Sequence, residues 1–302
     1  MSTAAYRAQV ALLVRLLPLV AAEPDFALKG GTAINLFWRD LPRLSVDIDL
    51  TYLPVADRAA SLAAIDAGLR RLAHAIQRTI AGSAVDLQGG DEGVRRLLVR
   101  TPATQVKIEV TPVLRGVVFP PERRVVTAPV EEAFGFAEAN LVSFEDLFAG
   151  KLVAALDRQH PRDLFDVRAL LATEGLTRPL MDAFLVYLVS HNRPMSEVLA
   201  PTRKDLTEAY ERTFVGMTDE DVPLEVLVQT REEMIAGLHQ ALTATDRRFL
   251  LGIKTGDPDW ASVGLEAAAA LPAVRWRLQN LAGLASDRRQ VLADRLREVL
   301  GL

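Results

Sequence analysis

The sequence predicts an α+β fold, in which an N-terminal domain with a mixed or antiparallel sheet is followed by an all-helical domain. Short runs that alternate apolar and polar residues occur only in the first 140 residues. From residue 143 onward, Leu, Ala and Arg recur at helical spacing nearly to the C-terminus. The length of 302 residues suits two domains, and we place them at 1–140 and 141–302.

The first element predicted is a helix over residues 5–22, which ends near Pro24. Arg7 and Arg15 lie in this apolar run, so it does not read as a signal peptide. No uncharged stretch approaches the ~18 residues that a membrane span needs. We therefore expect a soluble, cytoplasmic protein without a membrane partner.

The next segment combines a strand, a turn, a helix and a second strand. Residues 26–28 are apolar and predict a short strand, and residues 29–31 contain two glycines that predict a turn. Thr32 is the expected N-cap of a helix through Trp38. The period-two alternation of residues 44–50 predicts the second strand.

A long helix and a group of short strands complete the N-terminal domain. Residues 59–80 are rich in Ala, Leu and Arg and predict the helix. Residues 116–126 contain adjacent prolines, which indicate a loop or an edge strand. Antiparallel strands, with Gly89-Gly90 as turn residues, are expected at 85–87, 97–101 and 106–110.

Composition and charge narrow the possible functions. The chain has no cysteine, which excludes a disulfide scaffold, thiolate metal sites and a cysteine nucleophile, and this fits a reducing compartment. Its net charge of −4 argues against a general nucleic-acid coat. An RNA substrate held by a local basic patch, for which Arg95-Arg96 and Arg123-Arg124 are candidates, remains compatible with that charge.

The chemistry is expected at Asp47 and Asp49. Residues two apart on a strand project to one face, roughly 6–7 Å from each other. Such paired carboxylates suit Mg²⁺ or Mn²⁺ together with substrate phosphates. Val46, Ile48 and Leu50 are apolar and indicate that the strand is central in the sheet, where two like charges side by side repel unless a cation is present.

Two neighbouring features extend this expected site. Gly30 and Gly31 would let backbone amides approach a phosphate, and the Thr32 hydroxyl would add a donor. Glu109 is a candidate third carboxylate. It lies in the alternating strand 106–110, on the polar face that it shares with Lys107. The alternative for Glu109 is an ordinary strand residue paired with Lys107 or with a cross-strand arginine.

These residues resemble a known family. The segment LKGGTAINLFWRDLPRLSVDIDL is similar to polymerase-beta-type nucleotidyltransferases and, more narrowly, to the AbiEii/MenT family of toxins. The family's arginine-serine element would correspond to Arg43 and Ser45. Its downstream lysine and Arg-Asp-x-x-Asp element would correspond to Lys151 and to residues 162–166, which contain Asp163 and Asp166.

The resemblance implies transfer of a nucleoside monophosphate from an NTP to the 3′ end of tRNA by a toxin with a cognate antitoxin. Asp47 and Asp49 would bind the metal, with Glu109 as a third ligand or as a base. One of Asp163 and Asp166 would complete the catalytic site, and the choice between them stays open. The implied nucleotide-binding residues are Lys29, Gly30, Gly31, Thr32, Arg43, Ser45 and Lys151.

Other interpretations remain open at this stage. Pro161 suits the first position of a helix, which would place Asp163 in the first turn, and Asp166 could pair with Arg162. Lys151 lies among helix-core residues and needs an anion as a partner. The acceptor could instead be a small molecule, such as an antibiotic, or a protein hydroxyl. A catalytically silent nucleotide- or partner-binding module is the alternative of another class.

Overall fold

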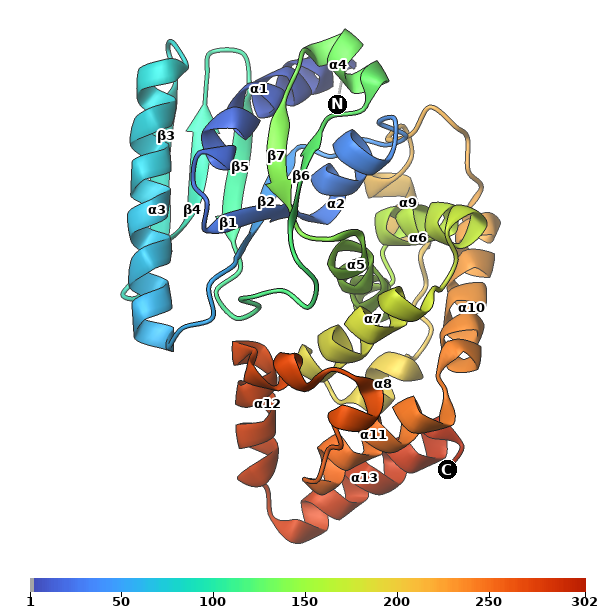
Figure 1. The fold of residues 1–302 in the computed structure, drawn as a ribbon. Coiled ribbons are helices and arrows are strands. Elements are labelled where there is room, and N and C mark those ends of the chain that lie inside the picture. The colour runs from blue at the N-terminus through green and yellow to red at the C-terminus, as the bar shows by residue number, and fades with distance from the viewer. Residues whose placement is uncertain (1–2) are drawn as a thin grey trace. The chain divides into compact units, whose positions relative to one another are not determined.

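The computed structural model describes residues 3–302, and their contacts divide the chain into two units. The first unit ends at Ser143 and contains the sheet, and the second spans Phe144–Leu302 and is helical. The predicted α+β class is confirmed, because 58% of the chain is helical and the seven strands form one mixed sheet (Figure 1).

The sheet of the first unit has the order β3-β4-β5-β2-β1-β7-β6. β2 pairs in parallel with β5, and β1 in parallel with β7, whereas the other pairs are antiparallel. β6 lies at one edge, in agreement with the prolines that precede it. The strands are β1 (Phe26–Lys29), β2 (Asp47–Tyr52), β3 (Ala84–Gly90), β4 (Gly93–Arg100), β5 (Gln105–Val110), β6 (Glu122–Val125) and β7 (Glu138–Leu141).

Helices α1 (Thr3–Ala21) and α3 (Arg58–Thr79) pack against this sheet and against each other (Figure 1). Alternate strand residues such as Ile48, Leu50 and Ile108 are fully buried, which explains the period-two pattern of the sequence. A short helix, α4 (Ala128–Phe134), precedes β7. The core of the unit is thus one apolar sheet face covered by helices.

The apolar character of α1 exceeds the expectation from sequence. Among the described residues it is the one helix that is long and apolar enough to cross a membrane, over Ala4–Ala21, by length and composition alone. Val10, Leu13 and Leu17 on this helix are fully buried, and α1 contacts β5 and β7. Because its apolar side chains pack inside the unit, α1 has the features of a core helix.

The turn and helix after β1 differ from the prediction. α2 (Gly30–Ala33) begins at Gly30 and continues directly as a π-helical turn, η1 (Ile34–Trp38). Lys29 occupies the N-cap position, although its side chain makes no capping hydrogen bond, so the prediction of Thr32 as N-cap was wrong. Thr32 lies inside the helix, where its hydroxyl has other partners, as described below.

Two strand boundaries were also predicted wrongly, and one strand was missed. β2 begins at Asp47 rather than residue 44, because the chain before it is an irregular segment that follows η1. Gly89 and Gly90 belong to β3, and the hairpin turn falls at residues 91–92. β7 was not predicted, since its four residues are too few to show a periodic pattern.

The second unit is built from helices, as predicted. Helix α5 packs against α6 and α7, α10 packs against α6, and α11 packs against α13. The helices are α5 (Phe144–Arg158), α6 (Pro161–Thr173), α7 (Arg178–Ser190), α8 (Met195–Leu199), α9 (Thr207–Thr213), α10 (Leu224–Ala241), α11 (Ala244–Thr255), η2 (Ala261–Val263), η3 (Glu266–Ala270), α12 (Pro272–Ala282) and α13 (Ser286–Leu300).

Candidate functional site

A row of four charged residues crosses the sheet of the first unit. Lys29 on β1 is the register partner of Asp49 on β2, and Asp49 is the partner of Glu109 on β5. Glu109 is in turn opposite Arg96 on β4. Because register partners project to the same face of a sheet, strand pairing alone brings together residues that lie up to 80 positions apart in the sequence.

Asp47 and Lys107 form a second, parallel row beside the first. The Lys107 ammonium lies 3.4 Å from Asp47 Oδ2 and 3.2 Å from Glu109 Oε2. Arg96 donates a hydrogen bond of 2.9 Å to the other oxygen of Glu109. The pairing proposed as an alternative for Glu109, with Lys107 and with a cross-strand arginine, is therefore present on both counts.

The environment shifts the pKa values of these groups in opposite directions. Burial raises the pKa of Asp49 more than the charge of Lys29 lowers it, and Asp47 and Glu109 add to the rise. Burial likewise lowers the pKa of Lys29. Although burial opposes it, hydrogen bonds from Arg96 and Lys107 lower the pKa of Glu109. The protein therefore stabilises the anionic form of Asp49 less than that of Glu109.

The two glycines make room for this site. Gly30 has a φ of +76°, and a Cβ atom placed on it would come within 2.8 Å of Asp49 Oδ2. A Cβ atom on Gly31 would come within 2.7 Å of the Arg43 guanidinium and 2.9 Å of Ser45 Oγ. Glycine is therefore required next to three of the predicted site residues because these side chains pack against the helix backbone.

Hydrogen bonds tie the segment before β2 to this helix. The Thr32 hydroxyl donates to the Asp47 carbonyl oxygen at 2.5 Å and lies 3.1 Å from Ser45 Oγ. Asn35, which is buried and was not predicted, donates to the Gly31 carbonyl oxygen at 2.7 Å and accepts from the Arg43 amide at 3.3 Å. These contacts fix the main chain at Asp47. The sequence pattern did not indicate this role for Thr32.

The chemistry of the carboxylates suits a hard divalent cation, since Asp47, Asp49 and Glu109 offer oxygen donors on one partly exposed face. In the part of the chain that the structure describes, no three acidic or histidine side chains stand close enough to hold a metal ion as they are. The Lys107 ammonium lies between Asp47 and Glu109. The donor set fits Mg²⁺ or Mn²⁺, and oxygens of Asp47 and Glu109 are paired with cationic side chains of the protein.

The second unit holds the other predicted residues in a buried cluster of its own. Lys151 on α5 lies 2.8 Å from Asp163 Oδ1 and 2.9 Å from Asp166 Oδ2, both on α6. All three are less than a tenth exposed. Arg158, which was not predicted, bonds Asp163 from the solvent side at 2.9 Å. The anion expected for Lys151 is thus supplied by both aspartates of the Arg-Asp-x-x-Asp element.

The start of α6 follows the local rules of helix initiation. Pro161 occupies its first turn, and Asp163 is an acidic residue in that turn, as the alternative interpretation predicted. The His160 Nδ1 atom accepts the Arg162 amide at 3.2 Å, so this histidine caps the helix. Its Nε2 atom lies 3.1 Å from the Thr213 hydroxyl, which gives His160 a structural role in the second unit.

The arginines considered for an RNA path have acidic partners in the first unit. Arg95 pairs with Glu92, Arg96 with Glu109, and Arg123 with Glu138. Arg124 pairs with Glu122 and also stacks on Trp38, with its guanidinium carbon 3.6 Å from the ring centroid. The positive charge of these residues is therefore largely offset by neighbouring carboxylates.

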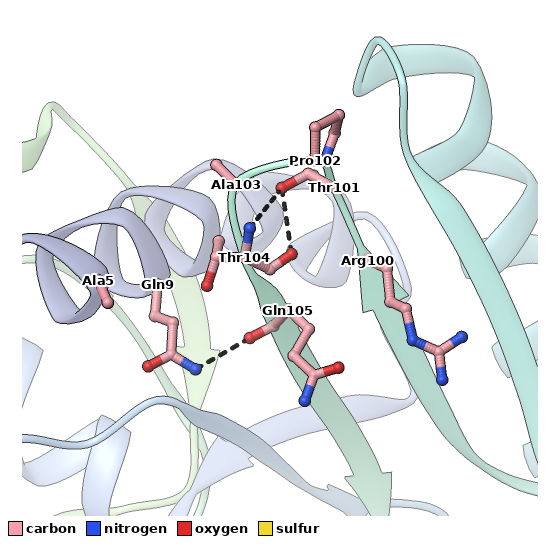
Figure 2. A pocket seen from close by; sticks show the side chains of 8 residues that line it. All are labelled: Ala5, Gln9, Arg100, Thr101, Pro102, Ala103, Thr104 and Gln105. Carbon is pink, nitrogen blue, oxygen red and sulfur yellow. Dashed lines mark hydrogen bonds between the residues drawn. The ribbon is translucent and has the colours of Figure 1, made fainter. Parts of the chain in front are cut away.

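A shallow pocket of about 360 Å³ lies beside the β4–β5 turn and the start of α1 (Figure 2). Gln9 donates a hydrogen bond of 3.2 Å to the Gln105 carbonyl oxygen, and both residues line the pocket. Thr101 and Thr104 hydrogen-bond each other across the turn. None of the predicted site residues lines this pocket. It is therefore distinct from the row of charged residues on the sheet.

Comparison with known proteins gives a class and a family. The chain belongs to the nucleotidyl transferase AbiEii toxin family of type IV toxin–antitoxin systems, whose sequence model matches residues 11–280. It is therefore a member of a nucleotidyltransferase family of toxins, for which an NTP substrate and an antitoxin partner are implied.

Among solved structures, MenT4, a nucleotidyltransferase toxin from Mycobacterium tuberculosis H37Rv, has a similar fold. Its TM-score is 0.62 at 17% sequence identity, and the match covers 99% of this chain and 95% of that chain. The comparison with curated proteins gave no match. The resemblance to the AbiEii/MenT family that the sequence motifs indicated is thereby confirmed.

Proposed function

We propose that this toxin transfers a nucleoside monophosphate from an NTP to an RNA acceptor, the 3′ end of tRNA, and thereby blocks translation in the cytoplasm. Membership of a nucleotidyltransferase family supports the type of reaction. The observation that carries the proposal is the meeting of Asp47, Asp49 and Glu109 on two paired strands next to Gly30.

In this proposal Asp47 and Asp49 hold Mg²⁺ or Mn²⁺ with help from Glu109. The bound cation would supply charge neutralisation at the transferred phosphoryl group and at the leaving pyrophosphate. Glu109 is assigned to cation binding rather than to proton abstraction, because its hydrogen bonds to Arg96 and Lys107 lower its pKa and make it a weaker base.

The remaining predicted residues are assigned to the nucleotide. Lys29, Arg43 and Ser45 offer two cationic groups and a hydroxyl near the carboxylates, and cationic and hydroxyl donors are suited to phosphate oxygens. Lys151 is assigned to the triphosphate on the family resemblance, with Asp163 and Asp166 holding its ammonium group. That one of these two aspartates is catalytic stays a prediction. Separate Asp163→Asn and Asp166→Asn substitutions would show which one it is.

The reaction would form a phosphodiester bond and break a phosphoanhydride bond of the NTP. The acceptor ribose oxygen forms a bond to the α-phosphorus of the NTP, and the bond between that phosphorus and the bridging oxygen to the β-phosphate breaks. Pyrophosphate leaves, and the hydroxyl proton passes to solvent. The protein contributes mainly by positioning the reactants and by electrostatic stabilisation of the developing charge.

The test is incubation of the full chain with each labelled NTP, Mg²⁺ and total tRNA. We expect labelled tRNA with the native chain and loss of at least about 100-fold in rate for Asp49→Asn, the range found when an electrostatic catalytic group is removed. Asp86→Asn is the matched control, because Asp86 is a sheet carboxylate paired with Arg100 outside the row. Absence of label with every NTP, alongside an active control nucleotidyltransferase, would refute tRNA as the acceptor.

The other acceptors give different outcomes in the same design. Label on an aminoglycoside-type hydroxyl compound or on protein, and none on tRNA, would assign the small-molecule or protein alternative. Growth arrest that persists in the Asp49→Asn variant would assign a binding function without catalysis. A reading frame for an antitoxin beside the gene would support the toxin–antitoxin arrangement that the family implies.

A further inference from the structure

We propose that Lys107 is a resident counter-ion of the carboxylate site, which occupies the position between Asp47 and Glu109 and must be displaced when a divalent cation binds. The Lys107 ammonium lies within 3.4 Å of one oxygen of each carboxylate. The inference rests on the proposed function, because it takes these carboxylates as the metal ligands.

The charge balance of the site points to such a counter-ion. Asp47, Asp49 and Glu109 carry three negative charges, while Lys29, Lys107 and Arg96 carry three positive charges on the same face. A divalent cation that approaches this balanced group gains little net attraction while every carboxylate keeps its internal partner. Binding therefore requires that one of the three cationic side chains moves away.

The contacts single out Lys107 among these three. Lys29 is anchored by a hydrogen bond of 3.1 Å to the Thr111 hydroxyl. Arg96 hydrogen-bonds Glu109 Oε1 at 2.9 Å. Lys107 alone among them bridges two predicted ligands, and its flexible side chain is about one-third exposed, so it can swing into solvent at small cost.

The consequence is a metal affinity set by competition inside the protein. When no metal is bound, the Lys107 ammonium offsets the repulsion between the Asp47 and Glu109 carboxylates. The same ammonium competes with a divalent cation and so weakens its binding. Removal of its charge should strengthen cation binding, whereas replacement by another cation should not. This behaviour separates a counter-ion from an ordinary strand residue, whose removal would leave affinity unchanged.

The experiment measures Mn²⁺ binding to the full chain by calorimetry, without nucleotide. Lys107→Met keeps the side-chain length and removes the charge, and we expect its apparent Kd for Mn²⁺ to fall by about tenfold, the effect of one partly exposed charge. Lys107→Arg should bind like the native chain. Arg100→Met is the matched control, because it removes a cation from another sheet carboxylate, Asp86, and should leave the Kd unchanged.

The outcomes separate this inference from the proposed function. An unchanged or higher Kd in Lys107→Met would overturn the counter-ion role, provided that Asp49→Asn weakens Mn²⁺ binding in the native background. If Asp49→Asn leaves Mn²⁺ binding intact, the metal site itself is wrong, whatever Lys107 does. Circular dichroism would verify folding, and Lys107→Gln, which is shorter but also neutral, provides a second variant should Lys107→Met misfold.

Discussion

The carboxylate of Asp49 packs against the α-carbon of Gly30, so closely that a Cβ atom there would lie 2.8 Å from Oδ2. Gly30 also has a left-handed backbone, with a φ of +76°. Two separate physical reasons thus favour glycine at this position: the backbone conformation and the space that Asp49 occupies. The two reasons make different predictions.

Gly30→Ala should lower both stability and activity. The left-handed backbone costs an alanine roughly 1–2 kcal/mol in free energy of unfolding. The added methyl group should also push the Asp49 carboxylate from its place, so we expect a loss of nucleotidyl transfer of about 100-fold or more, as displacement of a catalytic group by about 1 Å can cause. Urea unfolding and the transfer assay measure the two effects.

Gly135→Ala is the control for the backbone effect. Gly135 has a φ of +95°, but no atom lies within 4 Å of a Cβ atom at that position. We therefore expect a similar loss of stability with full transfer activity. Equal activity losses in both variants would show that the contact with Asp49 is irrelevant to the reaction.

Thr32→Val should lower the stability of the fold more than it weakens nucleotide binding. The Thr32 hydroxyl is buried and donates to the Asp47 carbonyl oxygen at 2.5 Å. Its replacement by a methyl group of similar shape should lower the free energy of unfolding by about 1–3 kcal/mol. The KM for NTP should change less than kcat, because Asp47 loses its support. A higher KM at unchanged stability would instead favour a direct phosphate contact.

Lys151→Met should destabilise the second unit, whatever its role in catalysis. The substitution leaves Asp163 and Asp166 buried near each other without the ammonium that lies within 2.9 Å of both. We expect a loss of about 3 kcal/mol in the free energy of unfolding, which is typical when one partner of a buried ion pair is removed. Urea unfolding followed by circular dichroism measures it.

The triple variant Lys151→Met, Asp163→Asn, Asp166→Asn is the companion measurement. Because it removes the buried charges together, it should recover part of the lost stability. Native stability in the single variant would contradict the structural role of the cluster. Loss of transfer in the triple variant, once stability is restored, would then report on catalysis alone.

Lys254 on α11 should make stability depend on pH in the alkaline range. It is 1% exposed, and burial, together with the charge of Arg277, lowers its pKa from 10.5 to about 8. Below pH 8 the folded chain carries an unfavourable buried charge, and this penalty is relieved as the pH rises from about 8 to 10.5, where only the unfolded chain still binds the proton.

Lys254→Met should therefore stabilise the protein at pH 7, by up to about 3 kcal/mol. The advantage over the native chain should shrink as the pH rises above 8. Urea unfolding of both chains at pH 7 and at about pH 9.5 gives the comparison. A constant difference between the two chains across this range would mean that Lys254 does not titrate as the structure indicates.

The sequence predicted the parts of the site that depend on local periodicity. Alternation along one strand is sufficient to place Asp47 and Asp49 on one face, and the same rule puts Lys107 and Glu109 together. The fold class followed from the contrast between alternating and helical segments. The assignment of these residues to catalysis and metal binding stays a prediction.

The pairing of residues across strands could not be predicted in this way. The row depends on the parallel register between β2 and β5, which places Asp49 next to Glu109, and a parallel pair leaves no local turn signal. Lys29 appeared to be a turn residue, yet through β1 it is the neighbour of Asp49. Thr32 failed as an N-cap because the helix begins two residues earlier, at Gly30, and the Thr32 hydroxyl donates to the non-local Asp47 carbonyl oxygen.

The order of strands across the sheet has a consequence for the newly made toxin. Lys29, Asp49 and Glu109 become neighbours only after β5 has paired in parallel with β2, and β5 is the fifth strand to leave the ribosome. A nascent chain that has not yet released residue 109 cannot assemble these three side chains. Under the proposed function, nucleotidyl transfer therefore cannot begin before residue 109 has left the ribosome.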